Sequence, residues 1–276
     1  MASGADKASG RIFVGVGGWT FEPWRESFYP KGLKKDAELA YMAERLTAIE
    51  INGTFYRGQK PETFRKWAEA APEGFRFPLK ASRFCTSRRV LADGAESVQR
   101  FFETGPTAMG DKLGPILWQL PATKRFEKDD LAAFLKLLPA EHDGVKLRHV
   151  IEAGHESFAD PAFVELLREA EAQVAPVTLD DPDHPTIADV TADFVYLRLE
   201  RSREEIETGY SADDLDRWAA RLKTYAAGGV PEDLPTLKGD APEKTPRDVY
   251  CFLISGAKIR NPAGAMALIE RLKDRR

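Results

Sequence analysis

The chain has 276 residues, of which 43% are hydrophobic, so it can form one large domain with a single core or two smaller ones. Its 40 basic and 44 acidic side chains give a formal net charge of -4, which excludes a chain-wide positive field and restricts any nucleic-acid contact to a local basic patch. The two cysteines, Cys85 and Cys251, match no metal-ligand spacing and favour free thiols in a reducing compartment.

The first residues of the chain, MASGADKASG, lack the apolar stretch of a signal peptide, and we expect residues 1–10 to form a disordered tail. No later segment approaches the ~18 apolar residues of a membrane span. We therefore expect a cytoplasmic protein with no membrane partner.

Short apolar runs rich in β-branched or aromatic residues recur along the chain. They are typical of strands and lie at 12–19, 48–56, 75–81, 115–121, 149–155, 175–180, 194–200 and 249–255. Between most of them, apolar residues recur at helical spacing, at 36–46, 95–105, 129–139, 160–173 and 211–229. Strands that alternate with helices predict a parallel sheet, and eight such units match a (β/α)8 TIM barrel and its ~250-residue length. The sequence therefore predicts one TIM-barrel domain over residues 11–276.

A doubly wound open sheet is the alternative architecture. Its dinucleotide-binding fingerprint is not met, because GVGGWT places Thr20 where the third glycine of G-x-G-x-x-G belongs.

The least regular units are the sixth, where only HPTIADV separates two strands, and the last, where residues 228–247 are rich in proline and glycine. We expect residues 228–247 to form a long loop before the final strand.

The alternation of side chains along a strand predicts which of them fill the barrel. In the run at 48–56, Ile49 and Ile51 would pack against the helices, and this turns Glu50 and Asn52 inward. The same reasoning turns inward Gly15, Gly17, Trp19, Lys80, Gln119, Glu152, Asp180 and Arg198. Most of the polar ones lie toward the C-terminal ends of their strands, where the active sites of TIM barrels are built.

Two interpretations of this polar interior remain open. The acids and bases could serve only to satisfy one another, since buried charges must be paired. They could also form a ligand site, because replacing an apolar core by so many polar groups costs stability without improving the packing.

Several motifs of the chain occur in the same order in a known family. The chain resembles the family catalogued as domain of unknown function 72, also called YecE-like, over residues 12–227. The motifs that carry this resemblance are Gly18-Trp19, Trp24, Phe28-Tyr29-Pro30, Glu50-Asn52-Phe55-Tyr56 and Gln119-Leu120-Pro121. The resemblance implies a TIM-barrel fold and no established activity.

The chain resembles a divergent member, because it departs from the family pattern at four places. Members usually have Glu-x-Arg-His-x-Ser-Trp where this chain has Glu152, Gly154, His155, Ser157 and Phe158. The usual Arg-x-His-Gly is Arg198-Leu199-Glu200-Arg201, and the usual Thr-His is Thr86-Ser87. The end of the last strand, where members carry an asparagine, has Leu253 and Ile254.

Metal binding is the first chemistry to weigh. Glu50, Glu152, Asp180 and His155 offer oxygen and nitrogen ligands, as in the metal-dependent isomerases and phosphodiesterases of barrel fold. Only one histidine is suitably placed, and Lys80 and Arg198 bring positive charge to the same cavity. We therefore assign no metal ligand.

Anion binding and aromatic stacking are the other two chemistries to weigh. Lys80, Arg198 and Arg83 could hold a phosphate or carboxylate, with Glu50 or Glu152 as general base if burial raises its pKa. The aromatic residues Trp19, Trp24 and Tyr56 could stack against a sugar or a base. In the alternative, the basic residues only neutralise the inward acids.

The sequence thus predicts acid–base chemistry on a phosphorylated or sugar-like small molecule, with Glu50, Glu152 and Lys80 as catalytic residues. Ligand contacts are expected from Trp19, Trp24, Asn52, Tyr56, Arg83, Gln119, His155, Asp180 and Arg198. The alternatives are a non-catalytic barrel that binds a small anion, a sugar-like ligand or nucleic acid, and a metal-dependent phosphodiesterase or isomerase. The sequence names no cofactor and does not decide whether the protein is an enzyme.

Overall fold

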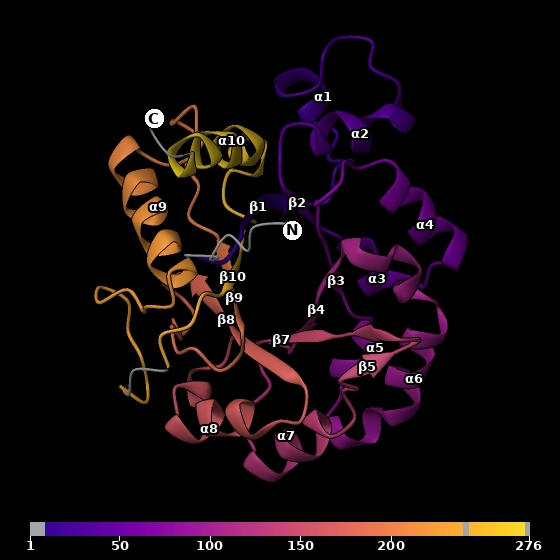
Figure 1. Ribbon diagram of the computed structural model, residues 1–276, viewed down its shortest axis with the longest axis vertical. Helices are drawn as coiled ribbons and strands as arrows, with labels where there is room; N and C mark the ends of the chain where they lie inside the picture. Colours follow the sequence, from indigo (N-terminus) through magenta and orange to yellow (C-terminus); the bar gives the residue numbers. More distant parts are fainter. Residues whose placement is uncertain (1–8, 240–242, 274–276) are drawn as a thin grey trace, which may run out of the picture.

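The centre of the molecule is a closed barrel of parallel strands. The computed structural model describes residues 9–239 and 243–273. Its 8-stranded sheet has the order β2-β1-β10-β9-β8-β7-β4-β3 (Figure 1). Bridges from Ala48 to Arg76 and from Ile51 to Leu79 join the two ends of this order and close the barrel. The strands are β1 (Ile12–Gly17), β2 (Ala48–Glu50), β3 (Phe77–Lys80), β4 (Leu113–Gln119), β7 (Arg148–Glu152), β8 (Gln173–Asp180), β9 (Phe194–Leu199) and β10 (Asp248–Leu253).

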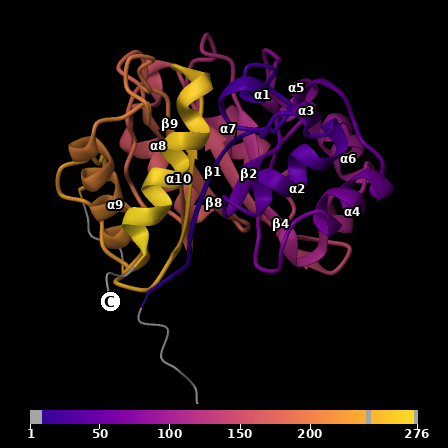
Figure 2. The ribbon, with the colours of Figure 1, turned by 90° about the horizontal axis from the view of Figure 1, so that it is seen from above.

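Helices surround the strands, and both views place α9 and α10 side by side (Figures 1 and 2). The helices are α1 (Trp24–Ser27), α2 (Glu38–Ala43), α3 (Gly53–Tyr56), α4 (Pro61–Glu69), α5 (Arg83–Thr86), α6 (Ala95–Glu103), α7 (Lys128–Leu135), α8 (Pro161–Glu169), α9 (Ala212–Ala226) and α10 (Asn261–Leu272). The 3-10 helices are η1 (Lys35–Ala37), η2 (Leu91–Gly94), η3 (Pro106–Lys112), η4 (Glu156–Phe158) and η5 (Lys258–Arg260), and a small hairpin joins β5 (Glu141–His142) to β6 (Val145–Lys146). The predicted TIM barrel is confirmed, and residues 181–193, between β8 and β9, contain no helix.

Local sequence decides where α9 begins and which face it buries. Ser211 Oγ accepts a hydrogen bond from the Asp214 N–H at 3.1 Å, and the Asp214 carboxylate accepts one from the Ser211 N–H at 3.3 Å. This reciprocal capping satisfies two backbone donors that the first turn leaves open. Leu215, Trp218 and Leu222 follow at helical spacing and are buried against the barrel.

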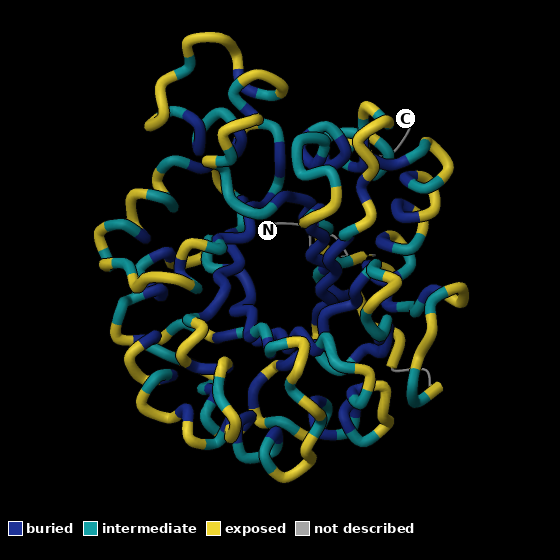
Figure 3. Tube along the Cα trace, turned by 180° about the vertical axis from the view of Figure 1, so that it is seen from behind, coloured by how far each residue is buried: buried dark blue, intermediate teal, exposed yellow. Residues whose placement is uncertain are grey.

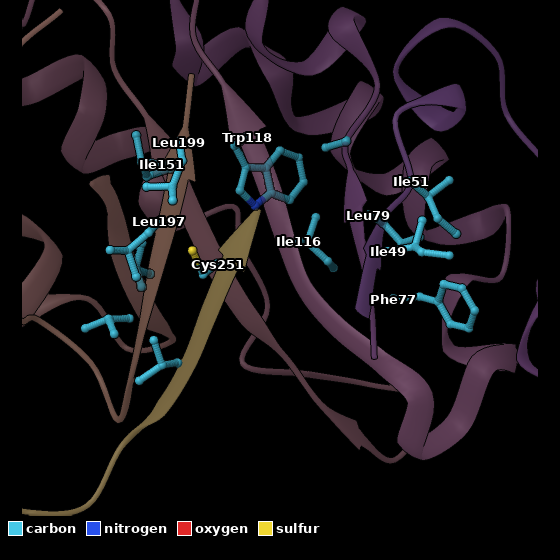
Figure 4. Packing of buried hydrophobic residues seen from close by; sticks show 14 of the residues in the cluster. Ile49, Ile51, Phe77, Leu79, Ile116, Trp118, Ile151, Leu197, Leu199 and Cys251 are labelled. Atoms are coloured by element: carbon cyan, nitrogen blue, oxygen red, sulfur yellow. The ribbon is translucent and has the colours of Figure 1, made fainter. Parts of the chain in front are cut away.

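Apolar side chains form two separate layers. The outer layer lies between the strands and the helices, and Figure 4 shows part of it, with Ile49, Ile51, Phe77 and Leu79 gathered beside β2 and β3. The inner layer fills the barrel toward the N-terminal ends of its strands. It consists of Phe13, Ala48, Leu117, Val150, Ala175, Val177, Leu179, Phe194, Tyr196, Tyr250 and Phe252. Buried residues accordingly line the central strands, and exposed residues lie on the outer helices and loops (Figure 3).

The expected tail and the expected loop are each described in part. Residues 1–8 lie outside the described residues, whereas the Gly10 N–H donates a hydrogen bond to the Ala226 carbonyl at 2.8 Å. The described part of the loop 228–247 contains no helix or strand, as predicted. The Asp189 carboxylate fastens this loop by accepting from the backbone N–H groups of Leu237 and Lys238 at 2.7 and 3.0 Å. Because the loop leads into the start of β10, it lies at the N-terminal end of the barrel.

Two further expectations concern thiols and membranes. Cys85 and Cys251 are both free and buried, and burial raises the pKa of the Cys85 thiol to about 12. Within the described ranges, no helix combines the length and the apolar character needed to cross a membrane.

Candidate active site

A cavity of about 450 Å³ opens among the C-terminal ends of the strands. Its polar lining comes from β3, β4, β7 and β9 and from the loops that follow β2 and β10. The polar side chains on its wall are Asn52, Tyr56, Lys80, Gln119, Glu152, His184, Arg198, Glu200, Ser255, Lys258 and Asn261. The volume is within the ~300–1,000 Å³ range of small-molecule sites.

One guanidinium holds three carboxylates together at the base of this cavity. Arg198 Nη2 lies 3.2 Å from Glu50 Oε1, and Arg198 Nη1 lies 2.6 Å from Glu152 Oε2 and 3.2 Å from Glu200 Oε1. The Arg198 side chain is 5% exposed, so these contacts form almost out of water. Burial opposes the charge of Arg198, yet Glu152 and Glu50 hold its pKa above the ordinary value.

Glu50 lies below the cavity wall and is fully enclosed. Besides Arg198, its carboxylate accepts a hydrogen bond from the Tyr196 hydroxyl at 2.7 Å and one from Asn52 Nδ2 at 3.1 Å. Three donors thus satisfy a carboxylate whose exposed fraction is 0%. Glu50 is therefore placed to support Arg198 rather than to meet a ligand.

Glu152 and Glu200 reach the cavity, unlike Glu50. Gln119 donates a hydrogen bond to Glu152 through its side-chain amide, and this fixes the orientation of that carboxylate. Burial raises the pKa of Glu200, Arg198 opposes this rise, and the Glu152 charge adds to it. The cavity therefore contains one carboxylate whose orientation Gln119 and Arg198 fix and one that burial holds closer to protonation than a free glutamate.

Two lysines line the cavity without a protein acceptor. Over residues 9–239 and 243–273, Lys80 Nζ and Lys258 Nζ have neither a hydrogen-bond acceptor nor a carboxylate within 4.0 Å. Lys80 Nζ lies 4.4 Å from the Phe55 ring, and Lys258 Nζ lies 4.7 Å from the Phe21 ring. Burial lowers the pKa of both amines, and for Lys80 the nearby Arg198 lowers it further. Both ammonium groups are therefore available to a ligand.

Six of the predicted inward residues lie together. Glu50, Asn52, Lys80, Gln119, Glu152 and Arg198 form or support the cavity wall, as the alternation in five separate strands predicts. Tyr56 also contributes to the wall, although it is 67% exposed. The roles that the sequence assigns to these residues stay predictions.

The prediction that Asp180 faces into the barrel is wrong. Val177 and Leu179 belong to the inner apolar layer, so Asp180 points to the outer side of β8. There it lines a separate cavity of about 500 Å³, with its Oδ1 3.7 Å from Arg201 Nη1. Polar residues of α9, among them Asp214 and Arg217, line the same cavity, and Thr178 on the same outer face donates to the Ile187 carbonyl at 2.9 Å. Polar residues could therefore take the outer positions.

The predicted inward position of Trp19 is also wrong. Gly18 adopts a φ of 72°, which glycine tolerates best, and this turn ends the alternation of β1. Trp19 packs edge-on against Trp67, with 5.4 Å between the ring centroids. Trp24 is fully buried, and its Nε1 donates to the Lys258 carbonyl at 2.9 Å, so it supports a loop of the cavity without lining it.

Arg83 and His155 lie outside the cavity wall as well. Arg83 is exposed on α5, and its guanidinium carbon lies 5.3 Å from the Phe84 ring. His155 Nδ1 accepts from the Ser157 N–H at 3.1 Å and thereby caps η4. The expected anion trio of Lys80, Arg198 and Arg83 is therefore not brought together.

Sequence reasoning missed Tyr196 and five polar residues of the cavity wall, namely His184, Glu200, Ser255, Lys258 and Asn261. Alternation from Arg198 points to Tyr196 and Glu200, so the signal for both was present. Lys258 follows β10 in a loop, where no periodicity predicts which way a side chain points.

The carboxylates of the metal hypothesis already have a cation. The Arg198 guanidinium bridges Glu50 and Glu152, while His155 and Asp180 lie elsewhere. In the part of the chain that the structure describes, no three His, Cys, Asp or Glu side chains are grouped so that they could hold a metal ion.

The fold and the cavity define a (β/α)8-barrel protein with a cavity lined by charged side chains at the C-terminal ends of its strands. The chain belongs to the family described as Protein of unknown function DUF72, whose model matches residues 13–276. This confirms the resemblance read from the sequence motifs.

Three similar proteins illustrate the extent of the likeness. The UPF0759 protein YecE of Escherichia coli (strain K12) is 30% identical over 142 residues, which are 50% of this chain and 48% of the relative. The UPF0759 protein YunF of Bacillus subtilis (strain 168) is 24% identical over 159 residues, 56% of this chain and 54% of the relative. The chain thus matches about half the length of these curated relatives. The crystal structure of a DUF72 family protein from Thermotoga maritima MSB8 shares the fold, with a TM-score of 0.71 and 21% identity over 96% of this chain and 100% of that one.

Proposed function

We propose that the cavity binds a phosphorylated or sugar-like small molecule and carries out acid–base chemistry on it. The observation that supports this most directly is the pairing pattern. Arg198 is engaged by three carboxylates, whereas Lys80 and Lys258 face the same cavity with no acceptor among the described residues. A barrel interior that only balanced its own charges would not leave two ammonium groups without partners.

The rest of the wall suits hydroxyl groups. Asn52 and Gln119 each use the amide nitrogen on a neighbouring carboxylate, so their amide oxygens are left to accept from a ligand. Ser255 adds a hydroxyl, and Leu253 and Ile254 add an apolar wall. A polyhydroxylated molecule with one anionic group would match this combination.

The acid–base pair of this proposal is Glu152 with Glu200. Both carboxylates line the cavity and share Arg198, but burial raises the pKa of Glu200. Two carboxylates that face one cavity, one of them with a raised pKa, can act as base and acid toward one ligand. Glu50, predicted as catalytic, instead becomes a positioning residue in this scheme, because it meets the cavity only through Arg198 and Asn52.

Calorimetric titration of the full chain with inorganic phosphate, ribose 5-phosphate and ribose tests this proposal. We expect Lys80→Gln and Lys258→Gln each to weaken sugar-phosphate binding by about 1.5–3 kcal/mol, the usual contribution of a charge-assisted hydrogen bond. Lys146→Gln, on the exposed hairpin strand β6, is the matched control and should leave binding unchanged. The proposal fails if the wild type binds none of the three ligands, or if all three variants bind alike.

Nucleic-acid binding is a second candidate, favoured by a groove of about 1040 Å³ at the same end of the barrel. Five basic and three acidic side chains line this groove, and the short helices α3 and α5 at this end of the barrel expose Tyr56 and Phe84 by 67% and 60%. Positive charge beside exposed aromatic rings suits a single strand. The basic residues are Arg88, Arg89, Lys124, Arg125 and Lys128.

Fluorescence anisotropy with a labelled single-stranded oligonucleotide separates the two candidates. The double variant Arg89→Glu/Arg125→Glu should abolish binding in the groove, and raising the salt concentration should weaken it in the wild type. Lys80→Gln should have no effect on it. If the oligonucleotide binds the wild type and the double variant equally, or binds neither, the groove is not a nucleic-acid site.

A further inference from the structure

Lys80, which is buried, differs from two half-buried lysines of the chain. Lys124 Nζ pairs with Asp130 Oδ2 at 2.6 Å, and Lys112 Nζ donates to the Ala68 and Ala71 carbonyls at 2.6 Å each. Lys80 is 8% exposed, yet no carboxylate or carbonyl of the described residues accepts from its Nζ. A desolvated amine without a partner is unfavourable for the stability of the fold, which suggests that it serves the chemistry of the cavity.

The backbone of Lys80 is held in place while its amine stays uncommitted. Its N–H donates to the Ile51 carbonyl at 2.9 Å, and its carbonyl accepts from Thr54 Oγ1 at 2.7 Å. The side chain extends from the end of β3 across the Phe55 ring, 4.4 Å from Nζ to the centroid, and into the cavity. This rigid mounting aims one amine at one region of the cavity.

The surroundings of Lys80 make it easier for its ammonium group to lose a proton and act as a nucleophile. Burial lowers the pKa of Lys80, and the Arg198 guanidinium lowers it further, while the carboxylates oppose this at distances beyond 4.0 Å. Desolvation and a neighbouring cation are the two devices that activate lysine amines toward carbonyl carbons. Lys258 has only the first of them, and it lies over the Phe21 and Trp24 rings.

From this geometry we infer that Lys80 forms an imine with an aldehyde or ketone, so that the ligand of the cavity is the open-chain form of a carbonyl compound such as a sugar phosphate. This inference rests on the proposed function and names its substrate class. It makes Lys80 the catalytic nucleophile and leaves Lys258 to hold the anionic end of the ligand.

The atoms balance without any oxidant or reductant. The Nζ lone pair forms a bond to the carbonyl carbon, and the carbonyl oxygen takes up the proton that the amine loses, which gives a carbinolamine. Glu200 then donates a proton to this hydroxyl, water leaves, and an iminium ion remains. Loss of a proton from the adjacent carbon to Glu152 gives an enamine. When Glu152 returns a proton to carbon, the iminium ion forms again, water adds to it while Glu200 takes back its proton, and the carbinolamine releases the carbonyl compound and the free amine.

The test traps the imine chemically in the full-length chain. Wild-type protein is incubated with glyceraldehyde 3-phosphate or dihydroxyacetone phosphate, reduced with sodium borohydride, digested and mapped by mass spectrometry. We expect a reduced adduct on Lys80 at a level about tenfold or more above that on the exposed Lys146, since an activated buried amine reacts ahead of ordinary surface amines. Lys258→Arg should keep the adduct on Lys80, and Lys80→Arg, which keeps the charge, should lose it.

The outcomes separate this inference from the proposed function. If calorimetry detects sugar-phosphate binding but Lys80 carries no more adduct than Lys146, the imine is refuted and the binding proposal stands. An adduct found mainly on Lys258 refutes it too. If no ligand binds and no adduct forms, both fail. Peptide mapping of the wild type needs no variant, so a poorly folding Lys80→Arg leaves the test decisive.

Discussion

The barrel interior has a lower half, at the N-terminal ends of the strands, and an upper half, at their C-terminal ends. The same strands contribute apolar side chains to the lower half and charged or polar side chains to the upper half. On β9, Tyr196 belongs to the apolar layer, and two residues further Arg198 holds three carboxylates. On β4, Leu117 and Gln119 repeat the contrast. The lower half is packed with rings, for example Phe13 and Tyr250 stacked with centroids 4.9 Å apart. The upper half gives up such packing for charge, and it is this half to which the proposed function assigns the ligand.

Tyr196 joins the two halves. Its ring stacks on Phe252 at a centroid distance of 5.2 Å, and its hydroxyl donates to Glu50. Burial raises the pKa of Tyr196 well above its ordinary value, and the Glu50 carboxylate adds to the rise. The hydroxyl therefore stays a proton donor, and the apolar layer fixes the lowest carboxylate of the polar half.

Removing the central guanidinium should have the largest effect. Arg198→Met leaves Glu50 and Glu152 buried without their cation, and we expect a loss of about 3–5 kcal/mol in the free energy of unfolding, measured by urea denaturation. Arg201→Met, whose side chain is 61% exposed, is the control and should change stability by less than about 0.5 kcal/mol. Equal losses in both would mean that the network is not the stabilising unit described here.

A substitution that creates a void in the lower half should reduce stability without weakening ligand binding. Leu117→Ala removes a fully buried side chain, and we expect a loss of about 3 kcal/mol in the free energy of unfolding. The affinity for a sugar phosphate, measured by calorimetry below the unfolding temperature, should stay at the wild-type value. A parallel loss of affinity would contradict the division between the two halves.

Removing the Tyr196 hydroxyl, which links the two halves, should lower the free energy of unfolding by a smaller amount. Tyr196→Phe keeps the ring in the apolar layer and removes one donor from Glu50, so we expect a loss of about 2 kcal/mol. Tyr225→Phe is the matched control, because its buried hydroxyl donates to the neutral Ala188 carbonyl at 3.0 Å, and it should cost about 1 kcal/mol. Similar losses would show that the charge of Glu50 has no part in the link.

The pH dependence contributed by Glu200 should be the smallest effect. Its pKa is raised in the folded protein, so the folded state binds its proton more tightly, and this stabilisation is present below the ordinary pKa of 4.5 and is lost as the pH rises through the folded value. Glu200→Gln should therefore gain stability relative to the wild type between pH 4 and pH 7, by less than about 1 kcal/mol because the carboxylate borders the cavity. Urea denaturation at both pH values measures the gain. If Glu200→Gln instead loses stability over this range, then the attraction of Arg198 for the Glu200 carboxylate outweighs the effect of burial on its pKa.

Much of this molecule follows from local pattern. The eight strands, the bounds of α9 and the inward side of Glu50, Lys80 and Arg198 come from periodicities of two and of three to four residues, which short stretches of sequence carry by themselves. The same alternation failed at Asp180, because it states which residues share a face of a strand and not which face turns inward. At Trp19 it failed because one glycine ended the strand.

Only the closed barrel decided which side chains meet. Arg198 contacts Glu50 across 148 positions of sequence and Glu152 across 46, and these contacts exist because β2, β7 and β9 end at the same rim. Lys258 reaches the cavity from the start of η5. Trp24, 234 positions earlier in the sequence, holds this segment in place by donating a hydrogen bond to the Lys258 carbonyl. Sequence by itself determined which residues are charged and on which strands they lie. The pairing of Arg198 with three carboxylates, which leaves two amines to the cavity, was decided by tertiary structure, because ion pairing depends on distances that chain closure sets.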